Sequence, residues 1–362
     1  MTRIAVNSRI WEQEPLSGIP LYIEKLYTEA QKVGVDVRFV QVAEEKTLGP
    51  TIVPNRHFPA PPPVFDLLLA NELAHASEAR IFHGPSHLIP LRPKRAVDRY
   101  VVTVHDLGFL ILPPALNQRR VFNTYYRWAV ARSVHSADAV LADSESTSHD
   151  LQRLLRVPAD KITVVHLGVD EQFRLPAEGP PAIDGRYVLS VSTHPRRKNI
   201  TRCLEALAAQ RPGHSDVRYV VAGALDREQR NDLRQQAASL GLNERLVLFG
   251  YATDAELVNL YAHAQCTLYP SFYEGFGLPV AEAMAAGCPV IASNNSSLPE
   301  VVGDETWLVD PYSTAAITQA LSAMLALRSA ERSELADRNR QRMQAFTWTR
   351  TLANTLEVLY GV

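Results

Sequence analysis

Short apolar runs alternate with longer amphipathic segments along most of the chain. Arg3–Ile10 and Val35–Val42 are short runs with many β-branched residues, which is typical of strands. Between them, residues 21–32 carry apolar side chains at helical spacing, and Gly34 ends that pattern. This pattern predicts a strand, a helix and a second strand, the unit from which parallel sheets with helical crossovers are built.

The alternation continues in two blocks, which are separated by a stretch without periodicity from Leu175 to Pro181. In the first block we expect further helices over 65–76, 117–133 and 144–156, and strands over 81–85, 100–104, 139–142 and 162–166. In the second block we expect strands over 187–191, 218–222, 246–250, 266–269 and 289–292, and helices over 200–209, 227–240, 254–264, 279–287, 313–327 and 348–359.

Two blocks of this kind predict an α/β protein made of two doubly wound parallel-sheet domains. The length of 362 residues agrees with two domains, because single cores stop growing near ~250–300 residues. We place the N-terminal domain at residues 1–170, the linker at 171–185 and the C-terminal domain at 186–345. We expect the last segment, 346–362, to form a helix that packs back on the N-terminal domain.

Composition narrows the class of protein. The chain is 46% apolar and 21% charged, with a mean hydropathy of −0.11, which is typical of a soluble globular protein. Its formal charge of −2 gives no broad basic surface for nucleic acid. No apolar run approaches the roughly 18–20 residues of a membrane span, and the N-terminus lacks the apolar region of a signal peptide.

The cysteines indicate the compartment in which the protein works. Cys203, Cys266 and Cys288 are scattered, and each lies in an apolar segment. They predict buried free thiols of a reducing compartment rather than a disulfide framework or a metal site. We therefore expect a cytoplasmic protein.

One stretch, from Tyr269 to Gly287, carries the strongest chemical signal. A short strand runs into a loop with two glycines, Pro279 opens a helix, and Gly287 closes it. Glycines let the backbone approach a bound group, and a helix N-terminus offers N–H donors and a positive dipole end. Glu274 in the loop and Glu282 one turn inside the helix add two carboxylates that can bind hydroxyls. We interpret the stretch as a phosphate-binding loop, because an ordinary strand-loop-helix explains neither the two glycines nor the two acids.

A second signal lies directly before the first helix of the second block. Arg196, Arg197 and Lys198 immediately precede the N-terminus of the helix expected at 200–209. Three cations at this place oppose the helix dipole, a cost that a plain structural loop would avoid. A bound anion would remove that cost, so this loop also favours a phosphate site.

Two further features have both a functional and a structural interpretation. His105 and Asp106 follow an apolar strand at its carboxyl end, where a histidine is well placed for chemistry but can equally make a structural hydrogen bond. The helix expected at 117–133 interleaves four arginines with aromatic residues. Such a helix can face a membrane surface or an anionic partner, or it can present one solvated and one packed face, which is the commoner case.

Several segments together resemble one family. EGFGLPVAE, with Glu274 and Glu282 separated by seven residues, resembles the paired-glutamate signature of the retaining glycosyltransferases of family 4, which have the GT-B fold. TVHDLGF, ADSESTSHDL, VVHLGVD, PRRKN, LFGYATDAELVNLYAHA and AAGCPVIAS fall in the order usual for that family. The resemblance covers nearly the whole chain and is closest to bacterial mannosyltransferases of polysaccharide and O-antigen synthesis. It implies two Rossmann-like domains that face each other across a cleft.

The resemblance also implies roles for individual residues. Lys198, with Arg197 beside it, would bind the donor diphosphate. Glu274 would hold hydroxyls of the transferred sugar, Glu282 would bind the ribose, and His105 would contact the sugar near the reacting carbon. His105, Lys198 and Glu274 are thus the catalytic candidates. The full set of expected donor-binding residues is Gly18, Arg196, Arg197, Lys198, Asn199, Gly223, Glu274, Gly275, Phe276, Gly277, Leu278 and Glu282.

The chain departs from the family pattern at two places. Ser192-Thr193 stands where many members carry a Gly-Arg pair, and Ser17-Gly18 stands where a double glycine is usual. One phosphate-binding arginine is therefore missing, and Arg196 or Arg197 is expected to replace it.

Transfer from a sugar nucleotide leaves negative charge on the diphosphate, which either a metal ion or protein cations can neutralise. No two aspartates have the i, i+2 spacing of a metal-binding DxD motif. The cations before the helix therefore predict transfer without a metal or cofactor. The resemblance implies retention of the anomeric configuration. Front-face displacement would need no enzyme base, whereas a covalent route would need Glu274 as nucleophile, which is the weaker alternative.

The substrates follow from the resemblance alone. GDP-mannose is the first choice among nucleotide-sugar donors, with rhamnose, fucose and glucose donors left open. The acceptor would be a glycan or a lipid-linked saccharide, met in peripheral contact with the inner face of the membrane. The alternatives are a sugar-nucleotide 2-epimerase, a phosphorylase acting on a glucoside, and a non-catalytic sugar-nucleotide-binding protein.

Overall fold

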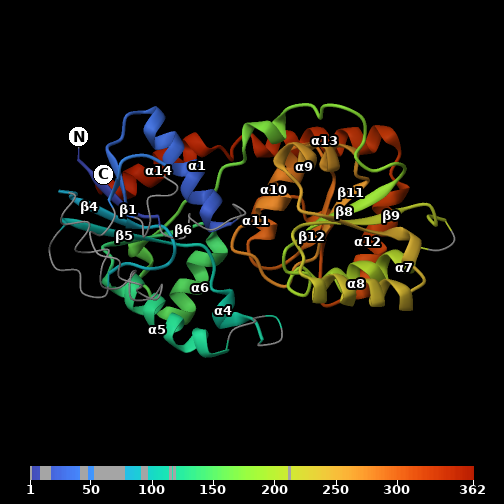
Figure 1. Cartoon of the computed structure of the whole chain (residues 1–362), viewed down its shortest axis with the longest axis horizontal. Helices are drawn as coiled ribbons and strands as arrows, with labels where there is room; N and C mark the ends of the chain where they lie inside the picture. Colours follow the sequence, from blue (N-terminus) through green and yellow to red (C-terminus); the bar gives the residue numbers. More distant parts are fainter. Residues whose placement is uncertain are drawn as a thin grey trace. The chain divides into compact units, whose positions relative to one another are not determined.

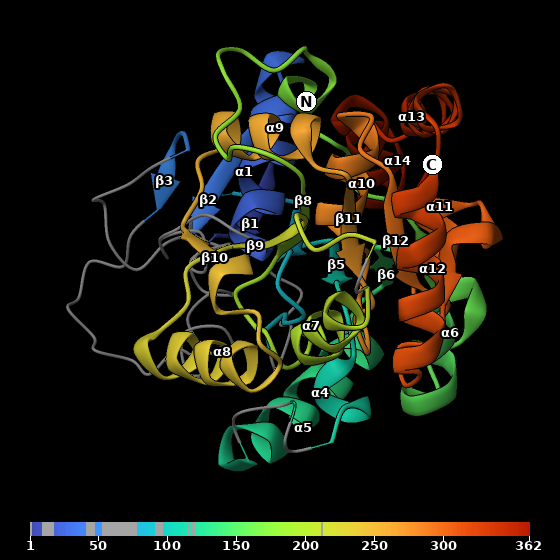
Figure 2. The same cartoon turned by 90° about the vertical axis from the view of Figure 1, so that its right-hand side faces the viewer.

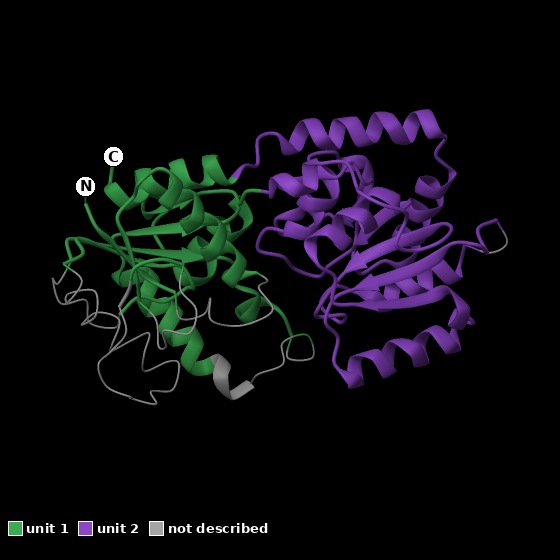
Figure 3. Cartoon of the chain, turned by 45° about the horizontal axis from the view of Figure 1, so that its top comes forward, with its two compact units in different colours: residues 1–168, 348–362 green, residues 169–347 purple. Residues whose placement is uncertain are grey.

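The computed structural model describes residues 2–8, 18–40, 48–52, 78–90, 97–113, 116, 120–210 and 213–362. The chain divides into two compact units: unit 1 comprises residues 1–168 and 348–362, and unit 2 comprises residues 169–347 (Figure 3). The helix expected at 65–76 lies outside the described residues. None of the helices in the described part of the chain is long and apolar enough to cross a membrane.

Unit 1 is built on a parallel sheet with the strand order β3-β2-β1-β4-β5-β6-β7. The order reverses next to β1, because Ile4 pairs with Val37 on one side and with Ile81 on the other. Figure 1 shows α1 and α14 on one face of this sheet and α5 and α6 on the other. Helices on both faces explain why the central strands are continuous apolar runs. The elements of unit 1 are β1 (Ile4–Asn7), α1 (Ile19–Lys32), β2 (Val37–Val40), β3 (Thr51–Ile52), β4 (Ile81–Gly84), β5 (Arg99–Val104), α4 (Gly108–Ile111), α5 (Arg120–Ser136), β6 (Ala139–Ala142), α6 (Glu145–Leu155), η3 (Ala159–Lys161), β7 (Ile162–Val164) and α14 (Trp348–Tyr360).

Unit 2 is built on a parallel sheet with the order β10-β9-β8-β11-β12-β13 (Figure 2). The chain winds outward from β8 to β10 and then returns, so that β11 pairs with β8 through Cys266 and Val188. Figure 1 shows α7, α8 and α12 on one face and α9, α10 and α13 on the other. The elements are η4 (Glu171–Arg174), β8 (Tyr187–Val191), α7 (Ile200–Ala208), β9 (Arg218–Ala222), α8 (Arg227–Ser239), η5 (Asn243–Arg245), β10 (Leu246–Gly250), α9 (Asp254–His263), β11 (Cys266–Tyr269), α10 (Leu278–Ala285), β12 (Val290–Ser293), α11 (Leu298–Val302), η6 (Glu305–Trp307), β13 (Leu308–Val309), α12 (Thr314–Ala326) and α13 (Ser329–Met343).

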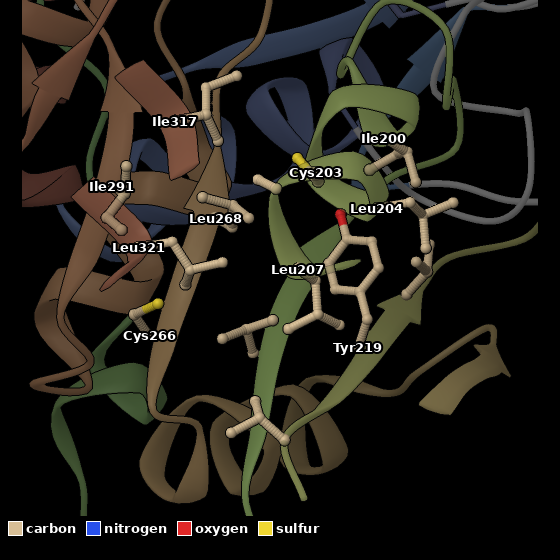
Figure 4. Close-up of a cluster of buried hydrophobic side chains, with 14 of the residues drawn as sticks. Ile200, Cys203, Leu204, Leu207, Tyr219, Cys266, Leu268, Ile291, Ile317 and Leu321 are labelled. Atoms are coloured by element: carbon tan, nitrogen blue, oxygen red, sulfur yellow. The ribbon is translucent and has the colours of Figure 1, made fainter. Parts of the chain in front are cut away.

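The two units confirm the predicted fold class, two doubly wound α/β sheets. One hydrophobic core cluster of unit 2 lies between its sheet and the helices α7, α8 and α12, and it includes Leu204, Leu268 and Leu321 (Figure 4). Cys203 and Cys266 are part of this core, and all three cysteines are free and buried, as expected. Burial raises the pKa of the Cys203 thiol to about 12, so this thiol is inert at neutral pH.

One segment at the unit boundaries differs from the expected layout. Residues 171–185, where we expected a linker, belong to unit 2 and are held there by Asn259 of α9. The Asn259 side chain accepts a hydrogen bond from Ala182 N at 2.8 Å and donates to the carbonyl oxygens of Glu178 and Pro180. The last helix, α14, belongs to unit 1, where its Thr351 hydroxyl donates to the His166 carbonyl at 2.8 Å.

The sequence did not predict α13. Its 15 residues are mostly charged or polar, so no broad apolar face marks it as a helix. Only Leu335, Asn339 and Met343 of α13 are buried, and they recur at a spacing of four residues. Asn339 donates a hydrogen bond to the Cys288 carbonyl at 3.0 Å, which ties α13 to the turn between α10 and β12.

One glycine is required by a close approach of two backbones. Gly223, after β9, has a φ of 145°, and a Cβ atom added to it would lie 2.0 Å from the Ser192 carbonyl oxygen.

We expect Gly223→Ala to destabilise unit 2 by more than about 1 kcal/mol, because neither backbone can yield without breaking the sheet edge. Urea denaturation measures the loss, with Gly213→Ala as the control, since a Cβ at Gly213 meets nothing within 4 Å. Equal stability of the two variants would contradict the prediction.

Candidate functional site

The candidate site of unit 2 lies where its strand order reverses. β8 and β11 are neighbours in the sheet although β9 and β10 separate them in sequence. The loops that follow them, residues 192–199 and 270–277, leave the carboxyl ends of parallel strands at one edge of the sheet. This is the place where open α/β sheets bind ligands. Most residues expected to hold the donor lie in these two loops.

A buried ion pair joins the two loops. The Glu274 side chain is 5% exposed, and its Oε1 atom accepts hydrogen bonds from Lys198 Nζ at 2.6 Å and from Ser271 Oγ at 2.5 Å. Its Oε2 atom accepts a hydrogen bond from Arg197 Nη2 at 3.2 Å. Lys198 Nζ also donates to the Tyr269 hydroxyl. A single carboxylate therefore gathers two cations from the opposite loop.

The ionisation of Glu274 depends on these partners. Burial by itself would raise the pKa of Glu274, but the charges of Lys198 and Arg197 and the hydrogen bonds outweigh it, so that the pKa lies below its ordinary value. The carboxylate is therefore charged at neutral pH, which a buried position allows only when partners are present. The three side chains carry two positive charges and one negative charge, a balance that suits an anionic ligand.

A serine-rich loop after β12 holds the Glu274 loop in place. Ser296 Oγ accepts a hydrogen bond from the Glu274 N–H at 3.0 Å, and Ser296 itself has a φ of 50°. Ser297 Oγ lies within hydrogen-bond distance of the carbonyl oxygens of Glu274, at 3.1 Å, and Phe276, at 2.9 Å. The backbone on both sides of the carboxylate is thus fixed, which preorganises the site.

The predicted helix after the Glu274 loop is confirmed, with slightly different ends. α10 begins at Leu278, and Pro279 is its second residue. Gly277 has a φ of 97°, and a Cβ atom there would come within 2.5 Å of the Leu298 side chain. The glycine therefore permits both the turn into α10 and the packing of α11 against it.

Two residues expected to bind the donor have other partners. Arg196 forms an ion pair with Asp232 of α8 at 3.2 Å, and its side chain is 66% exposed. Asn199 has a left-handed backbone and donates hydrogen bonds to the carbonyl oxygens of Pro270 and Pro311, at 3.1 and 2.7 Å. Arg197 rather than Arg196 therefore joins Lys198 at Glu274, and Asn199 fixes the loop that carries both.

The remaining expected residues are more dispersed. Glu282 lies one turn inside α10 and accepts a hydrogen bond from the Tyr261 hydroxyl at 3.3 Å. Gly223 is required by the Ser192 backbone described above. Gly18 precedes α1 in unit 1 with a φ of 59°, and the residues before it lie outside the described part of the chain.

In unit 1, His105 at the carboxyl end of β5 is held on every polar atom. Its Nδ1 atom lies 2.6 Å from Asp143 Oδ2, and its Nε2 atom lies 2.7 Å from the Pro85 carbonyl oxygen. Its backbone N–H donates to His87 Nε2 at 2.9 Å, and its carbonyl accepts from the Thr147 hydroxyl at 3.2 Å. Burial would lower the pKa of His105, but the Asp143 carboxylate outweighs it, so that the pKa lies above its ordinary value.

The sequence did not identify several of these partners. Ser271, Ser296 and Ser297 resemble ordinary loop serines, and their distance from Glu274 along the chain ranges up to 23 residues. Asp143 lies between the strand expected at 139–142 and the helix expected at 144–156, directly before the helix-capping Ser144. A polar residue directly after a buried strand was the available signal for Asp143, as it was for His105.

A doubly wound sheet with cations at its switch point is typical of proteins that bind phosphorylated ligands. Two family models match the chain: residues 16–173 match Glycosyltransferase Family 4, and residues 173–342 match Glycosyl transferases group 1. The chain therefore belongs to the glycosyltransferases of family 4 and group 1, which confirms the resemblance of its motifs.

Relatives with assigned names agree with this family. O-antigen chain mannosyltransferase B of Escherichia coli is 36% identical over 247 residues, which are 66% of this chain and 63% of that protein. An MMP alpha-(1->4)-mannosyltransferase of Mycolicibacterium hassiacum is 32% identical over 223 residues, which are 60% of this chain and 53% of that protein. The matches thus span less than two thirds of the length of these relatives.

Solved structures share the fold. Sucrose-phosphate synthase from Thermosynechococcus elongatus has a TM-score of 0.79 at 22% identity, covering 100% of this chain and 98% of that chain. Anabaena HepE in complex with UDP-glucose has a TM-score of 0.77 at 18% identity, covering 100% of both chains. At such identity the likeness shows the fold alone, which is the expected GT-B fold.

The Glu274 ion pair predicts a pH dependence of stability. Because the folded-state pKa of Glu274 is lowered, the pair stabilises the fold above pH 4.5, the ordinary pKa of this carboxyl, and the stabilisation is lost as the pH falls through the folded-state value. Glu274→Gln should therefore lower the free energy of unfolding at pH 7 by roughly 1–3 kcal/mol, less than for a fully buried pair because both cations reach solvent.

Denaturation of wild type and variant between pH 3 and 7 would show that difference shrinking in acid, where a protonated glutamate resembles glutamine. Glu228→Gln, an exposed glutamate of α8, controls for the loss of one charge from the same unit. A difference that stayed constant with pH would contradict the ionised pair.

Proposed function

We propose that this protein is a retaining glycosyltransferase that needs no metal and moves mannose from GDP-mannose to a glycan or lipid-linked acceptor. The buried Glu274 carboxylate with Lys198 and Arg197, at the switch point of unit 2, is the observation that carries the proposal. The names of the relatives support mannose, since both are mannosyltransferases. The donor-bound neighbour holds UDP-glucose, so the choice of GDP-mannose rests on the relatives and not on the fold.

In this proposal the donor diphosphate replaces Glu274 as the partner of the two cations. Lys198 and Arg197 would leave the Glu274 carboxylate for the phosphate oxygens, and Glu274 would then accept hydrogen bonds from hydroxyls of the sugar. The N-terminus of α10, directly after the Glu274 loop, would add its positive dipole end. Glu282, one turn further along, would bind the ribose. Glu274 thus serves as a hydroxyl-binding residue rather than as the nucleophile.

The proposed reaction is a displacement on one face of the sugar. The bond between the anomeric carbon and the diphosphate oxygen breaks, and its electron pair stays on that oxygen, where Lys198 and Arg197 stabilise the developing charge. The acceptor hydroxyl attacks the same face, and its proton passes to the leaving phosphate. This route retains the anomeric configuration and requires no basic side chain. Because the cations supply the charge, no metal ion is needed.

Unit 1 would supply the acceptor side of the reaction. The exposed face of α5 carries Arg127, Trp128 and Arg132, and the Trp128 residue is 51% exposed. Exposed arginines next to an indole suit the interface of an anionic membrane, where a lipid-linked acceptor would be found. We propose peripheral contact through this face at the inner side of the membrane.

Lys198→Met tests the charge-stabilising role. Because one preorganised cation at the leaving group is removed, kcat should fall by about 10²–10³-fold or more. Turnover of GDP-mannose with a mannoside acceptor measures the effect, and a thermal melt shows that the variant is folded. Lys32→Met, on the exposed surface of α1, is the matched control. Near-normal turnover by Lys198→Met would refute the assignment.

Chelation tests the metal-free mechanism. Excess EDTA should leave the initial rate of transfer within about twofold of the untreated rate, since Lys198 and Arg197 already neutralise the leaving group. Complete loss of transfer that Mg²⁺ restores would contradict this part of the proposal. Release of an epimerised sugar without any acceptor would instead identify the 2-epimerase alternative.

A further inference from the structure

The hydrogen bonds around His105 determine where its protons lie. A carbonyl oxygen can only accept a hydrogen bond, so the contact of 2.7 Å with Pro85 requires a proton on Nε2. On the other side of the ring, Nδ1 lies 2.6 Å from Asp143 Oδ2. One proton therefore lies between Nδ1 and Asp143, and its location decides whether this pair is neutral or ionic.

The surroundings of Asp143 favour the ionic form. A histidine ordinarily holds a proton more tightly than an aspartate, with reference pKa values of about 6.5 and 3.9. Asp143 also lies directly before Ser144, the N-cap of α6, where the helix dipole stabilises a negative charge. Its side chain is only 4% exposed and that of His105 is 11% exposed, so water screens the pair weakly.

The other groups around His105 leave the positive charge on that residue. His87 Nε2 accepts the His105 N–H, so its proton lies on Nδ1, which faces the Tyr126 hydroxyl. Burial and the His105 charge lower the pKa of His87 to about 3, so it is neutral. His83 is likewise neutral, because burial lowers its pKa to about 3.

Two more groups face the ring. The Tyr22 ring of α1 packs edge-on against His105 with centroids 4.8 Å apart. This tyrosine is uncharged, because burial raises its pKa. Asp106, the next residue in the chain, accepts a hydrogen bond from the Gly108 N–H and adds a further negative charge nearby. Both carboxylates therefore act in the same direction on His105.

We propose that Asp143 is a positioning residue which, together with the Pro85 carbonyl, keeps His105 doubly protonated and fixed, so that His105 acts as a stationary cation and not as a proton acceptor. This inference rests on the proposed function for any role in transfer. It removes His105 as a general base, because neither ring nitrogen carries a lone pair. It agrees with a displacement in which the leaving phosphate takes the proton of the acceptor hydroxyl.

A titration of the free protein tests the charge state without any substrate. Histidine labelled with ¹³C at Cε1 gives one NMR signal for each of the 11 histidines, and His105→Gln identifies the signal of His105. In the wild type His105 should still be protonated at pH 6.5, whereas in Asp143→Asn its midpoint should fall by about 1–3 pH units. Asparagine keeps an oxygen that can accept from Nδ1, so the ring remains held while the charge is lost. Asp160→Asn, an exposed aspartate of η3, is the control.

A wild-type His105 that is neutral at pH 6.5, or a midpoint that Asp143→Asn does not move, would overturn the proposal. Because this measurement needs no donor, it stands even when the protein transfers no sugar. The second readout is the pH profile of kcat. At low pH the rate of Asp143→Asn should approach the wild-type rate. As the pH rises, the rate of the variant should fall at a lower pH than the wild-type rate does. An equal loss at every pH would indicate a purely structural role and would also overturn the proposal.

Discussion

The buried carboxylate of Glu274 is the constraint on which the candidate site depends. It can remain charged only because Lys198 and Arg197 reach it from the neighbouring loop, and those cations in turn lie where they do because β8 and β11 are adjacent in the sheet. Asn199 and the serines after β12 fix the two loops through hydrogen bonds to their backbone. The strand order of unit 2 is therefore what converts separate stretches of sequence into a single charged site.

In unit 1 a buried charge is also compensated by a partner, but there the charges are reversed. There a histidine is held between a buried carboxylate and a carbonyl oxygen, at the carboxyl ends of the neighbouring strands β4, β5 and β6. In unit 2 a carboxylate is compensated by cations, whereas in unit 1 a cation is compensated by a carboxylate. Each charged group is tolerated at the sheet edge because its partner comes from a neighbouring strand or loop.

The sequence predicts the parts of this structure that depend on local pattern. Apolar runs and helical spacing locate most strands and most helices, and proline and glycine mark α10 correctly to within two residues. The two-residue strands β3 and β13 are too short to leave such a run. Contacts between distant segments leave no such pattern. Glu274 and Ser297 are 23 positions apart in the sequence, which conceals their hydrogen bond, and α13 is too polar to be detected as a helix. Arg196 shows the limit on the site itself, because three adjacent cations look equivalent until Asp232 is found beside one of them.

The location of the bound donor tests the central claim most directly. A crystal structure of the protein with GDP, or with GDP-mannose in a form that is turned over slowly, would show where the diphosphate lies. Our account predicts phosphate oxygens within hydrogen-bond distance of Lys198 and Arg197, with the Glu274 carboxylate turned to the sugar hydroxyls. A nucleotide bound elsewhere, with the Lys198–Glu274 pair still intact beside it, would contradict the account.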